Sequence, residues 1–196
     1  MKILWLCPVL NHYKLRNLDY LDKNYDLNIT ILAGSGRSNE GDKEIKLSST
    51  NLRIIKLDVL KKYFGLNLKV YKVLFKKYKS YDWIHIPRER KFFPLILVQF
   101  FLIKLSRCDV KIFSYCHQRF NRSPRSVNFF NNLIINFFHL FYDKIIFYSK
   151  KSMESSIEQG LIHELKAGYA DNTIYTKEIE KNFSFILPDS KEINLL

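Results

Sequence analysis

The densest group of side chains that could do chemistry lies in residues 117–125, which read HQRFNRSPR. One histidine and three arginines, Arg119, Arg122 and Arg125, occur here in nine residues without an acid. Guanidinium groups donate paired hydrogen bonds to phosphate and pyrophosphate. His117 could orient a substrate hydroxyl or exchange a proton with it near neutral pH. The same spacing is also consistent with a solvated basic loop in which His117 caps a strand.

Three further residues are candidates because they follow expected strands, where ligands sit in parallel α/β sheets. Asn11 and His12 follow the first strand, and Arg88 follows the fourth. We expect them to contribute to substrate binding, although His12 alone is more typical of a surface-loop histidine. His85, inside a strand, is more typical of a core histidine with satisfied hydrogen bonds.

The sequence contains no motif for a resident cofactor or metal. The turn at Gly34-Ser35-Gly36 follows the second strand, and Asn39 stands where a dinucleotide fingerprint needs its third glycine. There is no P-loop, no G-x-S-x-G elbow and no pair of histidines at metal-ligand spacing. We therefore expect neither a cofactor nor a metal.

Positive charge is concentrated in the middle of the chain. The formal net charge is +13, and residues 59–142 hold 16 lysines and arginines against three acids. Residues 60–81, LKKYFGLNLKVYKVLFKKYKSY, combine seven lysines with six aromatic residues and no acid. Basic residues interleaved with aromatics suit an anionic membrane surface or nucleic acid. They also suit an amphipathic helix that keeps its lysines in water. The candidate membrane-surface residues are Lys69, Lys72, Lys76, Lys77 and Lys79.

Length and composition indicate one globular domain. The chain has 196 residues, 47% of them hydrophobic, which suffices for a core of ordinary size. Three cysteines without a CxxC pair argue against a disulfide framework and favour a reducing cytoplasm. The longest apolar run, FFPLILVQFFLI at 92–103, is shorter than a membrane span. We interpret it as a buried or interfacial helix.

Strands and helices alternate along the sequence. Short apolar runs rich in Ile, Val, Phe and Tyr predict strands; they lie at 2–8, 27–34, 52–59, 81–87, 109–116, 143–149 and 165–170. Helical spacing predicts helices in four segments between them, at 66–80, 92–106, 126–141 and 150–160. This alternation predicts an α/β fold with a doubly wound, mostly parallel Rossmann-like sheet and helices on both faces.

The passage YDKIIFYSKKSMESSIEQGLIHELKAGYADNTIYT at 142–176 resembles a known family. A strand ending in Ser, a helix, a Gly, a short strand and N-T-I-x-T in this order resemble the end of the N-terminal domain in GT-B glycosyltransferases of the retaining family 4 type. The resemblance implies that His117 lies near the donor sugar and the acceptor hydroxyl. It also implies that Asn172 and Thr173 belong to a turn beside the substrate.

The resemblance implies a division of labour between two domains. Residues 1–176 would form the Rossmann-like acceptor-side domain, and 177–196 the linker and the start of a truncated second domain. That second domain would bind the nucleotide-sugar donor, so the present chain by itself is expected to be inactive. The acceptor would be a saccharide or a lipid-linked sugar for a cell-surface polysaccharide or glycolipid. We expect a cytoplasmic protein held peripherally at the inner face of the membrane, with nucleic acid the less favoured partner.

Two other interpretations of the sequence remain open. The chain could be a non-enzymatic basic α/β module that binds a membrane surface or nucleic acid. It could also be a truncated remnant that folds poorly and aggregates through an exposed interdomain face.

Overall fold

A computed structural model describes residues 1–35, 52–116 and 129–170. The described strands form one sheet of seven, all parallel, in the order β3-β2-β1-β4-β5-β6-β7. Their bounds are β1 Lys2–Cys7, β2 Asn28–Ala33, β3 Arg53–Lys56, β4 Trp83–His85, β5 Lys111–Cys116, β6 Lys144–Phe147 and β7 Ala167–Tyr169. Each coincides with a strand expected from the sequence. The expected doubly wound α/β fold is therefore confirmed.

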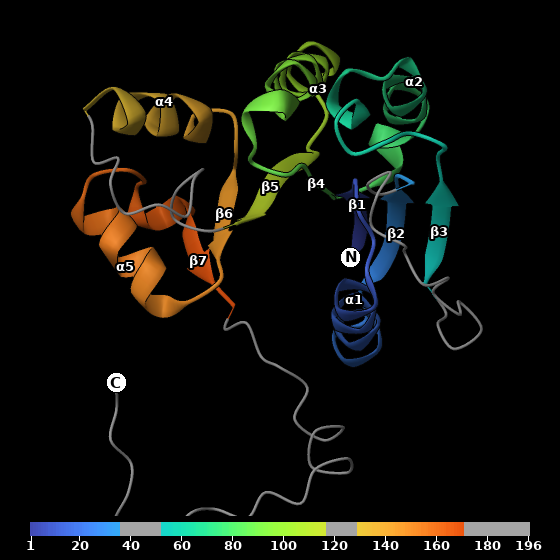
Figure 1. Cartoon of the computed structure of the whole chain (residues 1–196), viewed down its shortest axis with the longest axis horizontal. Helices are drawn as coiled ribbons and strands as arrows, with labels where there is room; N and C mark the ends of the chain where they lie inside the picture. The colour runs from blue at the N-terminus through green and yellow to red at the C-terminus, as the bar shows by residue number, and fades with distance from the viewer. Residues whose placement is uncertain (36–51, 117–128, 171–196) are drawn as a thin grey trace, which may run out of the picture.

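In the described residues, five α-helices lie on the two faces of the sheet (Figure 1). They are α1 His12–Tyr25, α2 Leu68–Lys77, α3 Phe93–Ser106, α4 Phe129–His139 and α5 Lys150–Glu158. Short 3-10 helices accompany them at Phe64–Leu66, Tyr78–Ser80, Arg90–Phe92 and Glu164–Lys166. Helices α2 to α5 match the four helices expected from the sequence. None of the described helices is long and apolar enough to cross a membrane.

Helix α1 was not expected, and it corrects the interpretation of His12 as a loop residue. Asn11 is the N-cap of this helix, and His12 is its first residue. Only a narrow apolar stripe, with Leu15 and Leu18 at its centre, is buried on the sheet. Because the other positions are mostly polar, the hydrophobic pattern alone did not reveal the helix.

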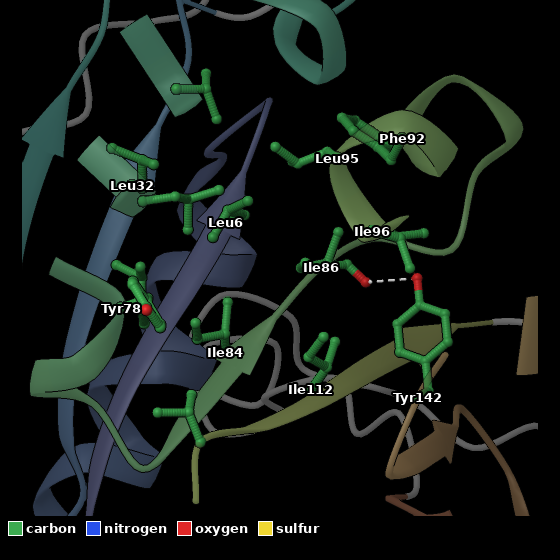
Figure 2. Close-up of a cluster of buried hydrophobic side chains, with 14 of the residues drawn as sticks. Leu6, Leu32, Tyr78, Ile84, Ile86, Phe92, Leu95, Ile96, Ile112 and Tyr142 are labelled. Carbon is green, nitrogen blue, oxygen red and sulfur yellow. Dashed lines mark hydrogen bonds between the residues drawn. The ribbon is translucent and has the colours of Figure 1, made fainter. Parts of the chain in front are cut away.

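The two faces of the sheet bury separate hydrophobic clusters. The larger cluster lies under α2, α3, α4 and α5 and includes Leu6, Ile84, Ile112 and Tyr142 (Figure 2). The smaller cluster lies under α1 and includes Ile31 and other apolar residues of β1, β2 and β5. Because strand side chains alternate between faces, each strand that is buried on both sides contributes to both clusters. This explains why the strands read as nearly continuous apolar runs.

The glycine-containing turn after β2 has a packing role. A Cβ atom on Gly34 would lie 2.7 Å from the carbonyl oxygen of Pro8 and 2.8 Å from that of Val59. Both neighbours are backbone atoms, so they cannot rotate away. We expect Gly34→Ala to lower the free energy of unfolding by about 2 to 3 kcal/mol, measured by urea denaturation.

Gly160 offers a matched control for that substitution. It follows α5 with φ +64°, and a Cβ there would meet nothing within 4 Å. Gly160→Ala should therefore cost only the left-handed backbone penalty, about 1 kcal/mol. Equal losses for the two variants would contradict a packing role for Gly34.

Candidate functional site

The order of the strands marks one place at the carboxyl edge of the sheet. From β1 the chain proceeds outward to β2 and β3, and then returns to place β4 on the other side of β1. At such a reversal the two connections leave in opposite directions, which opens a crevice outside the carboxyl ends of the two strands. The residues beside β1 and β4 are therefore the first to consider as a site.

The N-terminus of α1 lies directly after β1 at this reversal. The Asn11 side chain accepts a hydrogen bond from the backbone N–H of Lys14 at 2.9 Å. The ammonium of Lys14 donates to the carbonyl oxygen of Val9 at 3.3 Å. The first turn of the helix contains no acid. The helix dipole and the Lys14 ammonium therefore both favour an anion at this end of the helix.

His85, the last residue of β4, is buried beside β1. Its ring stacks on Trp5 with 4.1 Å between the ring centroids, and its Nδ1 lies 3.2 Å from the carbonyl oxygen of Leu6. Within the described part of the chain, its buried Nε2 has no hydrogen-bond partner. Among the described residues, one of the two ring nitrogens thus has the partner expected for a core histidine and the other has none.

The protonation state of His85 follows from its surroundings. Burial is the main cause that lowers its pKa to about 3; the Leu6 carbonyl opposes this shift, and the nearby charge of Lys14 adds to it. The ring is therefore neutral at pH 7. Because a carbonyl can only accept, Nδ1 carries the proton and donates to Leu6, which leaves Nε2 as an acceptor. Such a nitrogen is a weak base at neutral pH but can accept a hydrogen bond from a hydroxyl.

Arg88 lies beyond β4 on the opposite face of the sheet, where it is buried. Its Nη1 lies 2.7 Å from Nε2 of His139, and its backbone N–H donates to the hydroxyl of Ser114 at 3.1 Å. Because Nη1 donates to Nε2, His139 must carry its proton on Nδ1, which donates to the carbonyl oxygen of Leu161 at 2.6 Å. Burial and the charge of Arg88 lower the pKa of His139 to about 3, consistent with this neutral form.

Further buried polar groups surround the arginine. The hydroxyl of Tyr142 donates to the carbonyl oxygen of Ile86 at 3.2 Å, as Figure 2 shows, and burial raises the pKa of Tyr142. Burial also raises the pKa of the Cys116 thiol, although the charge of Arg88 opposes it. The thiol is therefore protonated at neutral pH and unsuited to act as a nucleophile. We conclude that this cluster fixes the segment after β4 rather than performing chemistry.

The structure describes only some of the residues that the sequence singled out. Asn11 stands at the helix N-terminus, and His12 follows it in α1. Arg88 points into the interior toward His139. The remaining candidates, His117, Arg119, Arg122, Arg125, Asn172 and Thr173, lie outside the described residues. Their roles stay predictions.

The candidate membrane-surface lysines lie in α2 and in the 3-10 turn that follows it. Lys69, Lys72, Lys76 and Lys79 are exposed, and Lys77 is half-buried. In residues 1–35, 52–116 and 129–170, no three His, Cys, Asp or Glu side chains lie together as metal ligands would.

Comparison with solved structures identifies the fold. The chain superposes on sucrose-phosphate synthase from Thermosynechococcus elongatus with a TM-score of 0.52 and 14% sequence identity, covering 91% of this chain and 93% of that one. It superposes on UDP-GlcNAc 2-epimerase from Methanocaldococcus jannaschii with a TM-score of 0.51 and 13% identity. The chain has a Rossmann-like α/β fold of the GT-B type. At these identities the likeness concerns the fold alone.

The match to the epimerase is partial, and no sequence match accompanies it. The match to the epimerase includes 86% of this chain but only 45% of the epimerase chain. No family profile matches the sequence, and no curated protein matches it. Membership of retaining family 4 therefore stays a prediction.

Proposed function

We propose that this chain is the acceptor-side domain of a sugar-nucleotide-dependent glycosyltransferase that makes a cell-surface polysaccharide or glycolipid. The observation that carries the proposal is the reversal of the strand order between β1 and β4, beside the N-terminus of α1. The GT-B type of fold and the family 4-like passage at 142–176 support the same assignment.

The side chains at this strand reversal suit a phosphorylated sugar. The N-terminus of α1 and the ammonium of Lys14 favour the negative charge of a phosphate or pyrophosphate. His85 is buried beside them, and it stays neutral with an unpaired acceptor nitrogen among the described residues. His117 is proposed to orient the acceptor hydroxyl, and Arg119, Arg122 and Arg125 to contact phosphate oxygens. Asn172 and Thr173 are proposed to lie in the turn beside the substrate.

The proposal assigns donor binding to a second domain. The nucleotide-sugar is a substrate of the complete enzyme, so no resident cofactor is proposed. Without the donor domain, both donor affinity and the positioning of the two reactants are lost. We expect negligible glycosyl transfer by the 196-residue chain, and robust turnover would contradict this part of the proposal.

Titration of the isotope-labelled chain followed by NMR amide shifts tests acceptor binding. The acceptor probe is a water-soluble, short-chain prenyl pyrophosphoryl monosaccharide, and the donor probes are UDP-glucose and UDP-N-acetylglucosamine. We expect the acceptor to shift amides at 9–14 and 86–89 and the donors to shift none. Lys14→Gln should weaken acceptor binding about tenfold, because a charge-assisted hydrogen bond to a phosphate oxygen is lost.

A matched control lies at the other end of the same helix. Lys23 in the last turn of α1 pairs with Asp19 at 2.7 Å, and Lys23→Gln should leave acceptor binding unchanged. Binding of the donors without the acceptor would overturn the assignment of this domain to the acceptor side.

The exposed lysines of α2 favour a second candidate function, a non-enzymatic basic module. For such a module, log affinity for single-stranded RNA or DNA should fall steeply with log salt concentration. Micromolar or tighter, salt-dependent nucleic-acid binding without acceptor binding would favour this alternative.

A further inference from the structure

Helix α3 is apolar on the side that faces away from the sheet. Its inward residues, including Leu95 and Ile103, are buried in the larger cluster. Its outward residues would be polar in an ordinary surface helix, yet Phe101 is 55% exposed and Leu105 is 81% exposed. This side of α3 therefore resembles a binding surface more than a solvent-exposed one.

Helix α3 also has a polar side chain, the amide of Gln99, on the side that faces the sheet. Gln99 points inward and is 1% exposed. Within the described residues, neither its Oε1 nor its Nε2 has a hydrogen-bond partner. A polar group buried without a partner is costly, while large apolar groups on the same helix face outward. The helix thus buries an amide side chain and exposes large apolar side chains, which is unfavourable for a helix surface in water.

Helix α4 extends this apolar surface. Leu133 and Leu140, in α4 and just after it, are 55% and 64% exposed, and Phe137 is 47% exposed. The helices are in contact, because the rings of Phe93 in α3 and Phe137 in α4 lie 5.6 Å apart. We call the five exposed residues of the two helices the α3–α4 surface: Phe101, Leu105, Leu133, Phe137 and Leu140.

Positive charge lies beside the α3–α4 surface without compensating acids. Helices α2, α3 and α4 contain no aspartate or glutamate. They lie along the same side of the sheet, away from α1 (Figure 1). Lys104 of α3 lies over the Phe100 ring at 5.5 Å, so its charge borders the apolar residues. The α2 lysines form the flank of this layer.

We propose that the α3–α4 surface lies on an anionic lipid bilayer. The five apolar side chains enter the interfacial region, and Lys69, Lys72, Lys76 and Lys79 contact the acidic headgroups. Large apolar groups bordered by lysines are the combination that an interfacial membrane helix requires. Burial of the apolar side chains contributes to membrane binding in addition to the attraction between the lysines and the acidic headgroups.

Charge complementarity selects the bilayer over a second copy of this chain. In a two-fold dimer, the same surface faces itself. The lysines of α2 and α3 would then oppose lysines, with no acid on these helices to compensate them. An anionic membrane instead neutralises them. The inference goes beyond the proposed function and does not depend on it, because it concerns lipid binding by the outer side of α2 to α4.

Vesicle co-sedimentation tests the proposal with two double variants. We expect the chain to bind vesicles of mixed phosphatidylglycerol and phosphatidylcholine, and to bind pure phosphatidylcholine weakly. Leu105→Ser/Leu133→Ser should weaken binding about tenfold or more, because apolar area no longer leaves water. Lys72→Gln/Lys76→Gln should weaken it about thirtyfold, because each lysine near an anionic surface contributes about 1 kcal/mol.

Matched controls carry the same changes elsewhere on the surface. Tyr25 at the end of α1 is 62% exposed and Leu165 is 78% exposed, so Tyr25→Ser/Leu165→Ser removes apolar groups of similar exposure. Lys150→Gln/Lys151→Gln removes two charges from α5. Both controls should bind vesicles as the unaltered chain does. Losses equal to those of the test variants would overturn the proposal.

Two further measurements separate insertion from its alternatives. Phe101→Trp should be quenched by brominated lipids, whereas Tyr25→Trp should show no more quenching than the unaltered chain. Binding that high salt abolishes, without quenching of Phe101→Trp, would overturn the insertion of α3. A dimer in analytical ultracentrifugation that Leu105→Ser/Leu133→Ser dissociates would overturn the bilayer in favour of a second copy. Acceptor titration in solution should be unchanged in that variant, so the two proposals can fail separately.

Discussion

Replacing His139 with leucine is expected to lower the free energy of unfolding by about 3 kcal/mol. The change removes the acceptor that lies 2.7 Å from Nη1 of Arg88 and the donor that lies 2.6 Å from the carbonyl oxygen of Leu161. A guanidinium charge then stays in the interior without this partner. Urea denaturation followed by circular dichroism measures the loss.

We expect substitutions of Arg88 and of His139 to lower the free energy of unfolding by different amounts. Arg88→Met removes the buried charge together with its hydrogen bonds, so it should destabilise less than His139→Leu. The double variant should lose less stability than the two single losses added together, by about 1 to 2 kcal/mol. His163→Leu, at an exposed histidine, should change stability by no more than about 0.5 kcal/mol. Strict additivity of the two single changes would show that the pair does not contribute.

The contact between Arg88 and His139 also affects the proposed site. The backbone N–H of Arg88 donates to Ser114, and the Tyr142 hydroxyl donates to the carbonyl oxygen of Ile86. These bonds hold the segment that follows β4 at the carboxyl edge of the sheet. His139→Leu should therefore weaken acceptor binding by displacing this segment, without removing any group that touches the acceptor.

Lowering the pH from about 7.5 to about 5.5 is expected to destabilise the fold by about 1.4 kcal/mol for each of two buried histidines. Burial holds the pKa of His85 and the pKa of His139 at about 3 in the folded chain, against about 6.5 when unfolded. Between these values the unfolded chain binds more protons, so stability is full above about pH 6.5 and is lost as the pH falls below it.

Denaturation curves at several pH values measure this dependence. Most carboxylates titrate below about pH 4.5, so the interval from about 7.5 to about 5.5 mainly reports histidines. His85→Phe keeps a ring that can stack on Trp5 and should remove about half of the pH dependence. Stability that stays constant over the interval would mean that neither histidine is held neutral in the folded chain.

The strands could be predicted because their signal is local. A strand buried on both faces must be apolar at nearly every position, as in Ile29 to Ala33. The runs that the sequence offers correspond to the strands of the described residues. The parallel arrangement followed from the helices between them, because parallel strands need long crossovers. Helix α1 was missed since only a few of its residues, such as Leu15 and Leu18, are fully buried.

The site could be predicted only in part. Asn11 was a candidate because it follows a strand, and it stands at the helix N-terminus beside the strand reversal. The role of Lys14 depends on that helix, which the hydrophobic pattern did not indicate. The contact between Arg88 and His139 spans 51 positions, and no local pattern connects two residues so far apart.

The sequence by itself determined the elements, their parallel arrangement and the excess of positive charge, because each depends on the types and spacing of neighbouring residues. Tertiary structure decided which residues meet: Arg88 with His139, and His85 with Trp5 and Leu6. It also decided the orientation of α3, whose residues are almost all apolar and therefore carry no periodic signal for one side. Only packing against the sheet shows that Phe101 and Leu105 face outward.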